Sequence, residues 1–293
     1  MKNLTVGICS LAAVALLGMP AVAQQQGQGA AKPKLYNTAK QKLLEGKQVF
    51  SFTQSTFDIA GYCEAAKHYD YTWFEMQHST LEFADIEKMI AACPHAGAIP
   101  MIRLPDAQEW HIQHATDIGC LGIVVPTVDD ADRAREAAQW ARFPPEARRS
   151  SGQGQAPGIW GPTYRQTYND NFLLVVMIET PTGVANAYDI ARVQGIDVVI
   201  IGNNDLSQFS GVPQTDPRYL AMVGQVRDAT LKAGKIFGQA NAQYATGNPY
   251  SSDSKFFQNG PSNDGYQPPS RGGRGGRGGP GGPGASAPPE GER

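Results

Sequence analysis

Charged and amide side chains end four apolar runs of this chain. Glu75 follows Thr-Trp-Phe, Arg103 follows Pro-Met-Ile, and Glu179 follows Val-Val-Met-Ile. The fourth run, Val-Val-Ile-Ile, leads into Gly202-Asn-Asn-Asp205, and His78 comes shortly after Glu75. A charge joined directly to an apolar run lies beside a dry core, where it is costly unless it has a partner. These residues are therefore candidates for a functional site.

Glu179 and Asp205 are the candidate metal ligands. They follow neighbouring strands, so both can point into one cleft, and two carboxylates with open positions for water and substrate suit Mg²⁺ or Mn²⁺. No His or Cys set is spaced for zinc. The alternative is that both carboxylates serve as helix caps or in salt bridges, although Thr180 before Pro181 is a better cap than Glu179.

The other candidates would act on an organic substrate. Arg103 offers a planar fork for a carboxylate or an enolate oxygen, or else pairs with Glu75 or Glu179. His78 can move a proton near neutral pH, with Asp117 as a residue that could orient it; both could equally be structural. The backbone N–H groups of the turn from Gly202 through Asn203 and Asn204 could cradle a substrate carboxylate.

The elements that must position these residues alternate between strand and helix. Continuous apolar strands are typical of a parallel sheet buried on both faces, and repeated β–α units favour a (β/α)₈ TIM-type barrel. No Gly-x-Gly-x-x-Gly follows the first strand to support a dinucleotide fold. The segment 143–171 is expected to be a long βα loop, and a weak eighth strand at 254–258 has no helix after it, so the last β/α unit is expected to be degenerate or truncated. The expected strands are 48–53, 71–75, 98–103, 121–125, 172–179, 197–201 and 235–238, and the expected helices are 57–68, 81–92, 107–118, 129–141, 183–193 and 217–233.

Both ends of the chain are expected to lie outside this barrel. Residues 1–23 have the layout of a secretory signal peptide, or alternatively of an uncleaved anchor, and predict export to a periplasmic or extracellular location. Residues 24–34 form a polar linker, 35–263 the barrel domain, and 264–293 a disordered Gly/Arg/Pro-rich tail. No other stretch is long and apolar enough to span a membrane.

Charge and cysteine usage give little support to other functions. The net charge is −2, and the folded part has no basic patch for nucleic acid; the Arg residues of the tail lie in RGG repeats. Outside the signal peptide, Cys63, Cys93 and Cys120 are widely spaced. Their odd number argues against a disulfide framework, so buried free thiols are expected, although one pair could bridge in an oxidising compartment.

The candidate residues occur within motifs that together resemble the HpcH/HpaI aldolase/citrate lyase family. In order along the chain, the motifs are Phe74-Glu-Met-Gln-His78, Met101-Ile-Arg-Leu-Pro105, Asp117-Ile-Gly-Cys-Leu-Gly-Ile-Val-Val-Pro126, Arg142-Phe-Pro-Pro145, Val176-Met-Ile-Glu-Thr180 and Ile201-Gly-Asn-Asn-Asp-Leu-Ser207. The resemblance implies a metal-dependent lyase for small 2-oxo acids. It implies Mg²⁺ or Mn²⁺ on Glu179 and Asp205, an enolate-stabilising Arg103, an acid/base His78 assisted by Asp117, and carboxylate-binding amides from Gly202 onward.

The sequence also departs from the family pattern. Glu75-Met-Gln-His78 replaces the usual Asp-Gly-Glu-His, Asn203 replaces a proline, and Met177 replaces a glutamine. Family relatives usually oligomerise by exchanging their last helix, which this chain lacks, so a homo-oligomer is possible and the oligomeric state stays open.

The resulting expectation is retro-aldol cleavage of a 4-hydroxy-2-oxo acid or related small oxo acid to a pyruvate-type enolate. The alternative is an exported, non-catalytic protein that binds a small acid or a surface through a degenerate aldolase site. A lyase for acyl-CoA thioesters ranks lower, because the folded region has no basic patch for the CoA phosphates.

Overall fold

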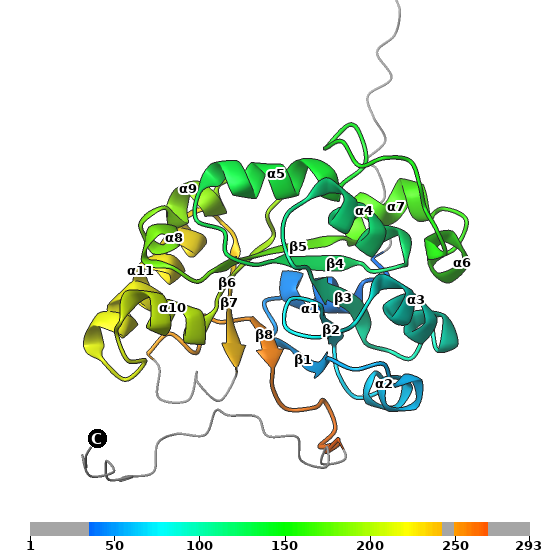
Figure 1. The fold of residues 1–293 in the computed structure, drawn as a ribbon, viewed down its shortest axis with the longest axis horizontal. Coiled ribbons are helices and arrows are strands. Elements are labelled where there is room, and N and C mark those ends of the chain that lie inside the picture. Colours follow the sequence, from blue (N-terminus) through cyan, green and yellow to red (C-terminus); the bar gives the residue numbers. More distant parts are fainter. Residues whose placement is uncertain (1–34, 242–248, 269–293) are drawn as a thin grey trace, which may run out of the picture. The chain divides into compact units, whose positions relative to one another are not determined.

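Eight parallel strands form a closed barrel in chain order, β1 to β8, with β8 pairing back to β1. The computed structural model describes residues 35–241 and 249–268, and all eight strands lie within these ranges (Figure 1). The strands are β1 Val49–Gln54, β2 Tyr71–Glu75, β3 Ile99–Arg103, β4 Gly122–Val125, β5 Leu173–Ile178, β6 Val198–Ile201, β7 Ile236–Asn241 and β8 Phe256–Asn259. The predicted (β/α)₈ TIM-type fold is confirmed.

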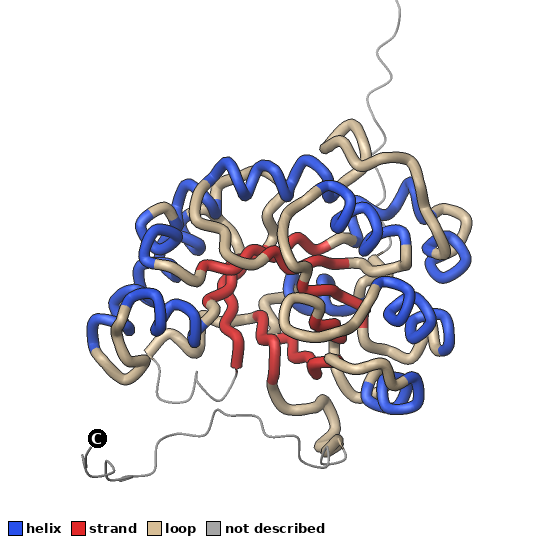
Figure 2. The backbone as a smooth tube through the Cα atoms, viewed as in Figure 1, coloured by secondary structure: helices blue, strands red, loops and turns tan. Residues whose placement is uncertain are grey.

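Helices surround the strands on the outside of the barrel (Figure 2). Several begin at a side chain that caps the first turn: Asp58, Asp130 and Thr180 each accept a hydrogen bond from a backbone N–H of the helix that follows. The helices are α1 Thr38–Leu44, α2 Ile59–Ala65, α3 Phe83–Ala92, α4 Glu109–Asp117, α5 Ala131–Ala141, α6 Ala156–Trp160, α7 Tyr164–Asn171, α8 Pro181–Ala185, α9 Ala187–Ala191, α10 Asn203–Ser210 and α11 Pro217–Lys232.

Aromatic side chains fill the barrel interior near the amino ends of the strands, and charged side chains lie at the carboxyl ends. Tyr71 stacks on Phe256 across the interior, with ring centroids 4.6 Å apart, and Trp73, two residues further along β2, is fully buried. Because side chains alternate along a strand, Glu75 shares the inward face with Trp73, and it lies in register with Arg103 of β3. All strands are parallel, so their carboxyl ends meet at the same rim, and this rim is the mouth of the barrel.

Several predicted elements differ from the observed ones. The segment 143–171, predicted as a βα loop, contains α6 and α7 and connects α5 to β5, so it belongs to the end of the barrel opposite the mouth. The predicted helix 183–193 is divided into α8 and α9 at Asn186, whose side-chain amide donates to the Asp129 carbonyl. The turn after Gly202 is the first turn of α10, and α1 was not predicted.

The described part of the last β/α unit consists of a strand and a loop. Strand β8 pairs with both β7 and β1, but the described residues that follow it, 260–268, contain no helix. The predicted tail begins with ordered contacts, because Asp264 Oδ2 lies 2.7 Å from His68 Nδ1 and the Tyr266 ring stacks on the His68 ring. The predicted signal peptide and linker, and the tail from residue 269, lie outside the described residues.

The cysteines also depart from expectation. Cys63 and Cys93 form a disulfide between α2 and the end of α3, closing a separation of 30 residues. Of the cysteines that the structure describes, Cys120 is a buried free thiol, as expected. The sequence could not show the pair because their proximity comes from α2 packing against α3. Among the described residues, no helix combines the length and the apolar composition needed to cross a membrane.

Candidate functional site

A cavity of about 440 Å³ lies at the mouth of the barrel, over the carboxyl ends of β3, β5, β6, β7 and β8. It brings together all but one of the predicted site residues: His78, Arg103, Glu179, Gly202, Asn203, Asn204 and Asp205. Asp117 is the exception. The side chains that converge here come from separate β/α units, which is the arrangement of active sites in barrels of this type.

One carboxylate oxygen of Glu179 accepts hydrogen bonds from Thr127, and the other lies beside Gly202. Its Oε2 accepts hydrogen bonds from the backbone N–H of Thr127 at 2.7 Å and from the Thr127 hydroxyl at 3.1 Å. Thr127 has a φ of 50°, in the left-handed region that β-branched residues rarely adopt, so the loop holds strained backbone at this contact. A Cβ on Gly202 would lie 2.3 Å from Glu179 Oε1, and only glycine leaves room for that oxygen.

The Glu179 and Asp205 carboxylates line the same cavity and interact electrostatically. Burial raises the pKa of Glu179, the Thr127 hydrogen bonds lower it, and the nearby Asp205 carboxylate raises it further. Within the described residues, Glu179 Oε1 and the Asp205 carboxylate accept no hydrogen bond from a side chain. Hard oxygen donors with open positions around them fit Mg²⁺ or Mn²⁺, so the residues present suit the metal that the sequence predicts. Among the described residues, no group of three or more His, Cys, Asp or Glu side chains is clustered as a metal site.

Arg103 is buried in the mouth and is fixed by Glu75. Glu75 Oε2 accepts from Arg103 Nε at 2.7 Å and from Trp73 Nε1 at 3.0 Å, and it lies 2.5 Å from Arg103 Nη2. The Arg103 guanidinium also lies over the Trp73 ring, 5.7 Å from its centroid. Within the described residues the Nη1 group has no hydrogen-bond partner, so it is left for a ligand in the cavity. Glu75 was a candidate from its place at a strand end, and its pairing with Arg103 is one of the two roles that the sequence left open for this arginine.

His78 lies on the exposed rim of the cavity. Its backbone N–H donates to Glu75 Oε1 at 3.0 Å, which fixes the loop that carries it. No hydrogen bond to the His78 ring occurs within the described residues, so the ring is free to meet a substrate. The same Glu75 carboxylate therefore orders both the arginine and the loop of the histidine.

Asp117 does not accompany His78, and the prediction that it orients this histidine is not supported by its position. It ends α4, five residues before β4 begins, and a helix after a strand runs back toward the amino ends of the strands. There its carboxylate accepts from Arg149 Nη2 at 2.8 Å, and the Arg149 side chain is fully buried. Asp117 neutralises this buried guanidinium at the end of the barrel opposite the mouth.

In the turn after β6, one backbone N–H group forms a hydrogen bond within the fold, and the next three face no acceptor within their helix. The Gly202 N–H donates to the Ile178 carbonyl at 3.1 Å, so it cannot bind a substrate carboxylate as predicted. The N–H groups of Asn203, Asn204 and Asp205 belong to the first turn of α10, where an α-helix has no internal acceptors for them. These three N–H groups remain suited to binding an anion. Gly202 instead leaves space for the Glu179 carboxylate, because it has no side chain.

Besides Met177, four further residues line the cavity and were not predicted: Ala240, Asn241, Gln258 and Asn259. These four stand at the ends of β7 and β8, the two strands with the weakest apolar pattern in the sequence. The side-chain amides of Asn241, Gln258 and Asn259 make this side of the mouth neutral, opposite the charged side formed by β2, β3, β5 and β6.

Comparisons with known proteins agree with this geometry. The family model described as HpcH/HpaI aldolase/citrate lyase matches residues 52–244. The chain is 30% identical over 219 residues to a hydroxypyruvate/pyruvate aldolase of Roseobacter denitrificans, covering 69% of this chain and 83% of that protein. It is 32% identical over 210 residues to a 2-keto-3-deoxy-L-rhamnonate aldolase of Klebsiella pneumoniae, covering 70% of this chain and 79% of that protein.

Solved structures show the same fold. An HpcH/HpaI aldolase from Desulfitobacterium hafniense superposes with a TM-score of 0.67 at 27% identity, covering 74% of this chain and 88% of that one. An HpcH/HpaI aldolase/citrate lyase family protein from Burkholderia cenocepacia has a TM-score of 0.69 at 24% identity, with 75% and 91% of the two chains covered.

Proposed function

The chain belongs to the HpcH/HpaI aldolase/citrate lyase family, and on this premise we propose that it is a metal-dependent carbon–carbon lyase. Its substrate would be a 4-hydroxy-2-oxo acid, cleaved between C3 and C4 to an aldehyde and a pyruvate-type enolate. The observation that carries the proposal is the convergence of Glu179, Asp205 and Arg103 on one cavity at the barrel mouth. The aldolase names of the relatives at 30% and 32% identity support the same reaction class.

Glu179 and Asp205 would hold Mg²⁺ or Mn²⁺. When bound, the metal would polarise the 2-oxo group and stabilise negative charge that develops on its oxygen. Thr127 keeps Glu179 Oε2 occupied, which leaves Oε1 and the Asp205 carboxylate to face the ion.

The remaining side chains would handle the organic substrate. The N–H groups at the start of α10 bind its carboxylate, and Arg103 Nη1 donates to the oxygen that becomes the enolate oxygen. His78 takes the proton from the C4 hydroxyl as the C3–C4 bond breaks. The bonding electrons pass to C3 to form the enolate, C4 becomes the aldehyde carbon, and a proton returned to C3 completes pyruvate.

The test is turnover of a panel of 4-hydroxy-2-oxo acids by purified protein with Mg²⁺ or Mn²⁺. We expect Glu179→Ala and Asp205→Ala to lose both bound metal and turnover, and Glu109→Ala, which changes a surface carboxylate of α4, to keep both. Identical behaviour of the wild type and Glu179→Ala across the panel would refute the proposal. Thermal stabilisation by oxo acids without turnover would instead favour the non-catalytic binding protein.

We also propose that the protein is exported. Residues 1–23 carry the signal-peptide pattern, and a disulfide such as Cys63–Cys93 persists in oxidising compartments. Cell fractionation of the full chain, with deletion of residues 2–23 as the control, tests this. Retention of the full chain in the reducing cytoplasm, with both cysteines as free thiols, would refute it.

A further inference from the structure

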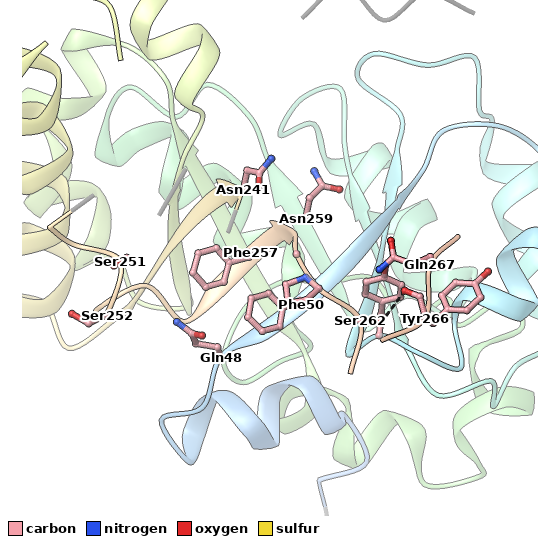
Figure 3. Close-up of a pocket in the computed structure, with 13 residues that line it drawn as sticks. Gln48, Phe50, Asn241, Ser251, Ser252, Phe257, Asn259, Ser262, Tyr266 and Gln267 are labelled. Carbon is pink, nitrogen blue, oxygen red and sulfur yellow. Dashed lines mark hydrogen bonds between the residues drawn. The ribbon is translucent and has the colours of Figure 1, made fainter. Parts of the chain in front are cut away.

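A second and larger cavity lies on the outside of the barrel, where the last helix of a complete (β/α)₈ barrel would pack. Its volume is about 750 Å³, and it runs along the outer faces of β1 and β8 (Figure 3). The described residues after β8 form a loop here, and Gly260, Ser262 and Tyr266 of this loop line the cavity. The described residues therefore enclose a walled cavity beside β1 and β8.

The described residues that line this outer cavity carry no charge. It consists of aromatic rings, side-chain amides, hydroxyls, glycine and proline, whereas the mouth cavity contains Arg103, Glu179 and Asp205. The partly exposed Phe50 ring stacks on the buried Phe257 ring, with centroids 5.3 Å apart, and forms the aromatic wall of the cavity. Rings of this kind offer flat apolar faces, and amides and hydroxyls both donate and accept hydrogen bonds. The chemistry matches an uncharged ligand with a flat apolar face and hydroxyl groups, which is the chemistry of a sugar ring.

The outer cavity and the mouth share a wall. Asn241 of β7 and Asn259 of β8 line both cavities, and they are register partners at the ends of their strands. Asn259 is anchored because its Oδ1 accepts a hydrogen bond from the Thr53 hydroxyl at 2.9 Å. Figure 3 shows both asparagines at the strand tips, with the Phe50 and Phe257 rings further down the same face. A ligand bound in the mouth can therefore continue over this neutral rim into the outer cavity.

We propose that the outer cavity binds an uncharged sugar ring carried on the aldehyde side of the oxo acid substrate. This inference rests on the proposed lyase function and narrows its substrate class. The oxo acid end would occupy the charged side of the mouth, the C4 carbon would lie toward Asn241 and Asn259, and the ring would stack against the aromatic wall. The division follows the charges, because the acid half meets Arg103 and the α10 amides while the neutral half meets only uncharged groups.

The test compares two substrates, each with the wild type and with a variant whose outer cavity is filled. The substrates are a 4-hydroxy-2-oxo acid with a methyl tail and one with a glycosyl ring on C4. Ser252 lines the outer cavity with an exposed side chain, so Ser252→Trp would fill it without disturbing the core, and Ser252→Ala is the matched control. We expect Ser252→Trp to lower kcat/KM for the glycosyl substrate about tenfold or more, mainly through KM, and to leave the methyl substrate unchanged. Ser252→Ala should resemble the wild type on both.

A binding measurement separates this inference from the lyase activity. Unreactive methyl glycosides, which lack the oxo acid, should show saturation-transfer NMR signals with the wild type and Ser252→Ala but not with Ser252→Trp. If the wild type cleaves neither oxo acid, the proposed activity fails and the glycoside signals alone decide the outer cavity. Absence of glycoside binding by the wild type, or equal loss of both substrates in Ser252→Trp, would overturn the inference.

Discussion

Thr127 provides a sharp test of the proposed metal site, because it contacts Glu179 and lies outside the cavity lining. Its backbone N–H and its hydroxyl both donate to Glu179 Oε2, at 2.7 and 3.1 Å. Thr127→Val removes only the hydroxyl bond, keeps the β-branched shape, and leaves the backbone N–H in place. The change therefore loosens the glutamate without removing it.

The size of the effect follows from the bond that is lost. A hydrogen bond to a charged group contributes about 1.5–3 kcal/mol, and the hydroxyl bond here is the longer of the two that Oε2 accepts. The lower end of that range is therefore expected, and about 1.4 kcal/mol corresponds to a tenfold change in affinity. Residues that orient metal ligands typically alter metal affinity about 10- to 100-fold when they are changed. We expect the Kd for Mn²⁺ to rise about tenfold in Thr127→Val.

Calorimetric titration of the metal-free protein with Mn²⁺ measures this effect directly. Thr127→Ser keeps the hydroxyl and should bind Mn²⁺ as the wild type does, and Glu179→Ala should show no binding at the mouth. Mn²⁺ affinity in Thr127→Val equal to that of the wild type would refute the reasoning, as would an equal loss in Thr127→Ser. Thermal melts of each variant would reveal any loss of fold.

Three further predictions concern stability and the end of the barrel opposite the mouth. Burial raises the pKa of Glu179 in the folded, metal-free protein, so its ionisation costs stability as pH rises through that pKa; Glu179→Gln should have the higher Tm at about pH 8, and the gap should shrink toward about pH 4. Equal Tm values for both proteins at all pH values would contradict this. The Cys63–Cys93 bridge closes a separation of 30 residues, so reduction should lower the free energy of unfolding by about 3–4 kcal/mol in urea titrations, whereas the variant with both cysteines changed to serine should not respond to reductant. Asp117→Asn should lower the Tm by leaving Arg149 poorly neutralised, yet leave the pH profile of kcat/KM unaltered; a shifted profile would restore Asp117 to the site.

The strands and their polar ends could be predicted because that signal is local. The predicted strand 71–75 coincides with β2, and the side chains at the ends of β2, β3, β5 and β6 do meet at one rim. In a parallel barrel this outcome does not depend on the precise strand bounds, since any inward-facing residue at the carboxyl end of a strand must face the same mouth. Glu179 and Asp205 needed only this argument to be brought together.

What failed were inferences that depended on contacts between distant segments. The position of Asp117 followed from the direction of α4, which carries a residue near the helix end away from the mouth. From the sequence, the Gly202 N–H was expected to be available to a substrate, but it donates a hydrogen bond to the Ile178 carbonyl at the end of β5. The disulfide required the packing of α2 on α3, which no cysteine spacing reveals. The pairing of Arg103 with Glu75 was one of the expected alternatives, but the hydrogen bond from the His78 backbone N–H to the same carboxylate appears only in the structure.

Closure of the barrel rests on strand pairing and on its aromatic interior. The strand β8 pairs on both sides, and Phe256 fills the interior against Tyr71, so the sheet is closed without a contribution from any described helix after β8. The groups proposed to bind metal and acid come from units three to six of the barrel, away from β8. The proposed chemistry would therefore be held on the charged side of the mouth, because the ends of β7 and β8 form the neutral side, where the aldehyde side of the proposed substrate would lie.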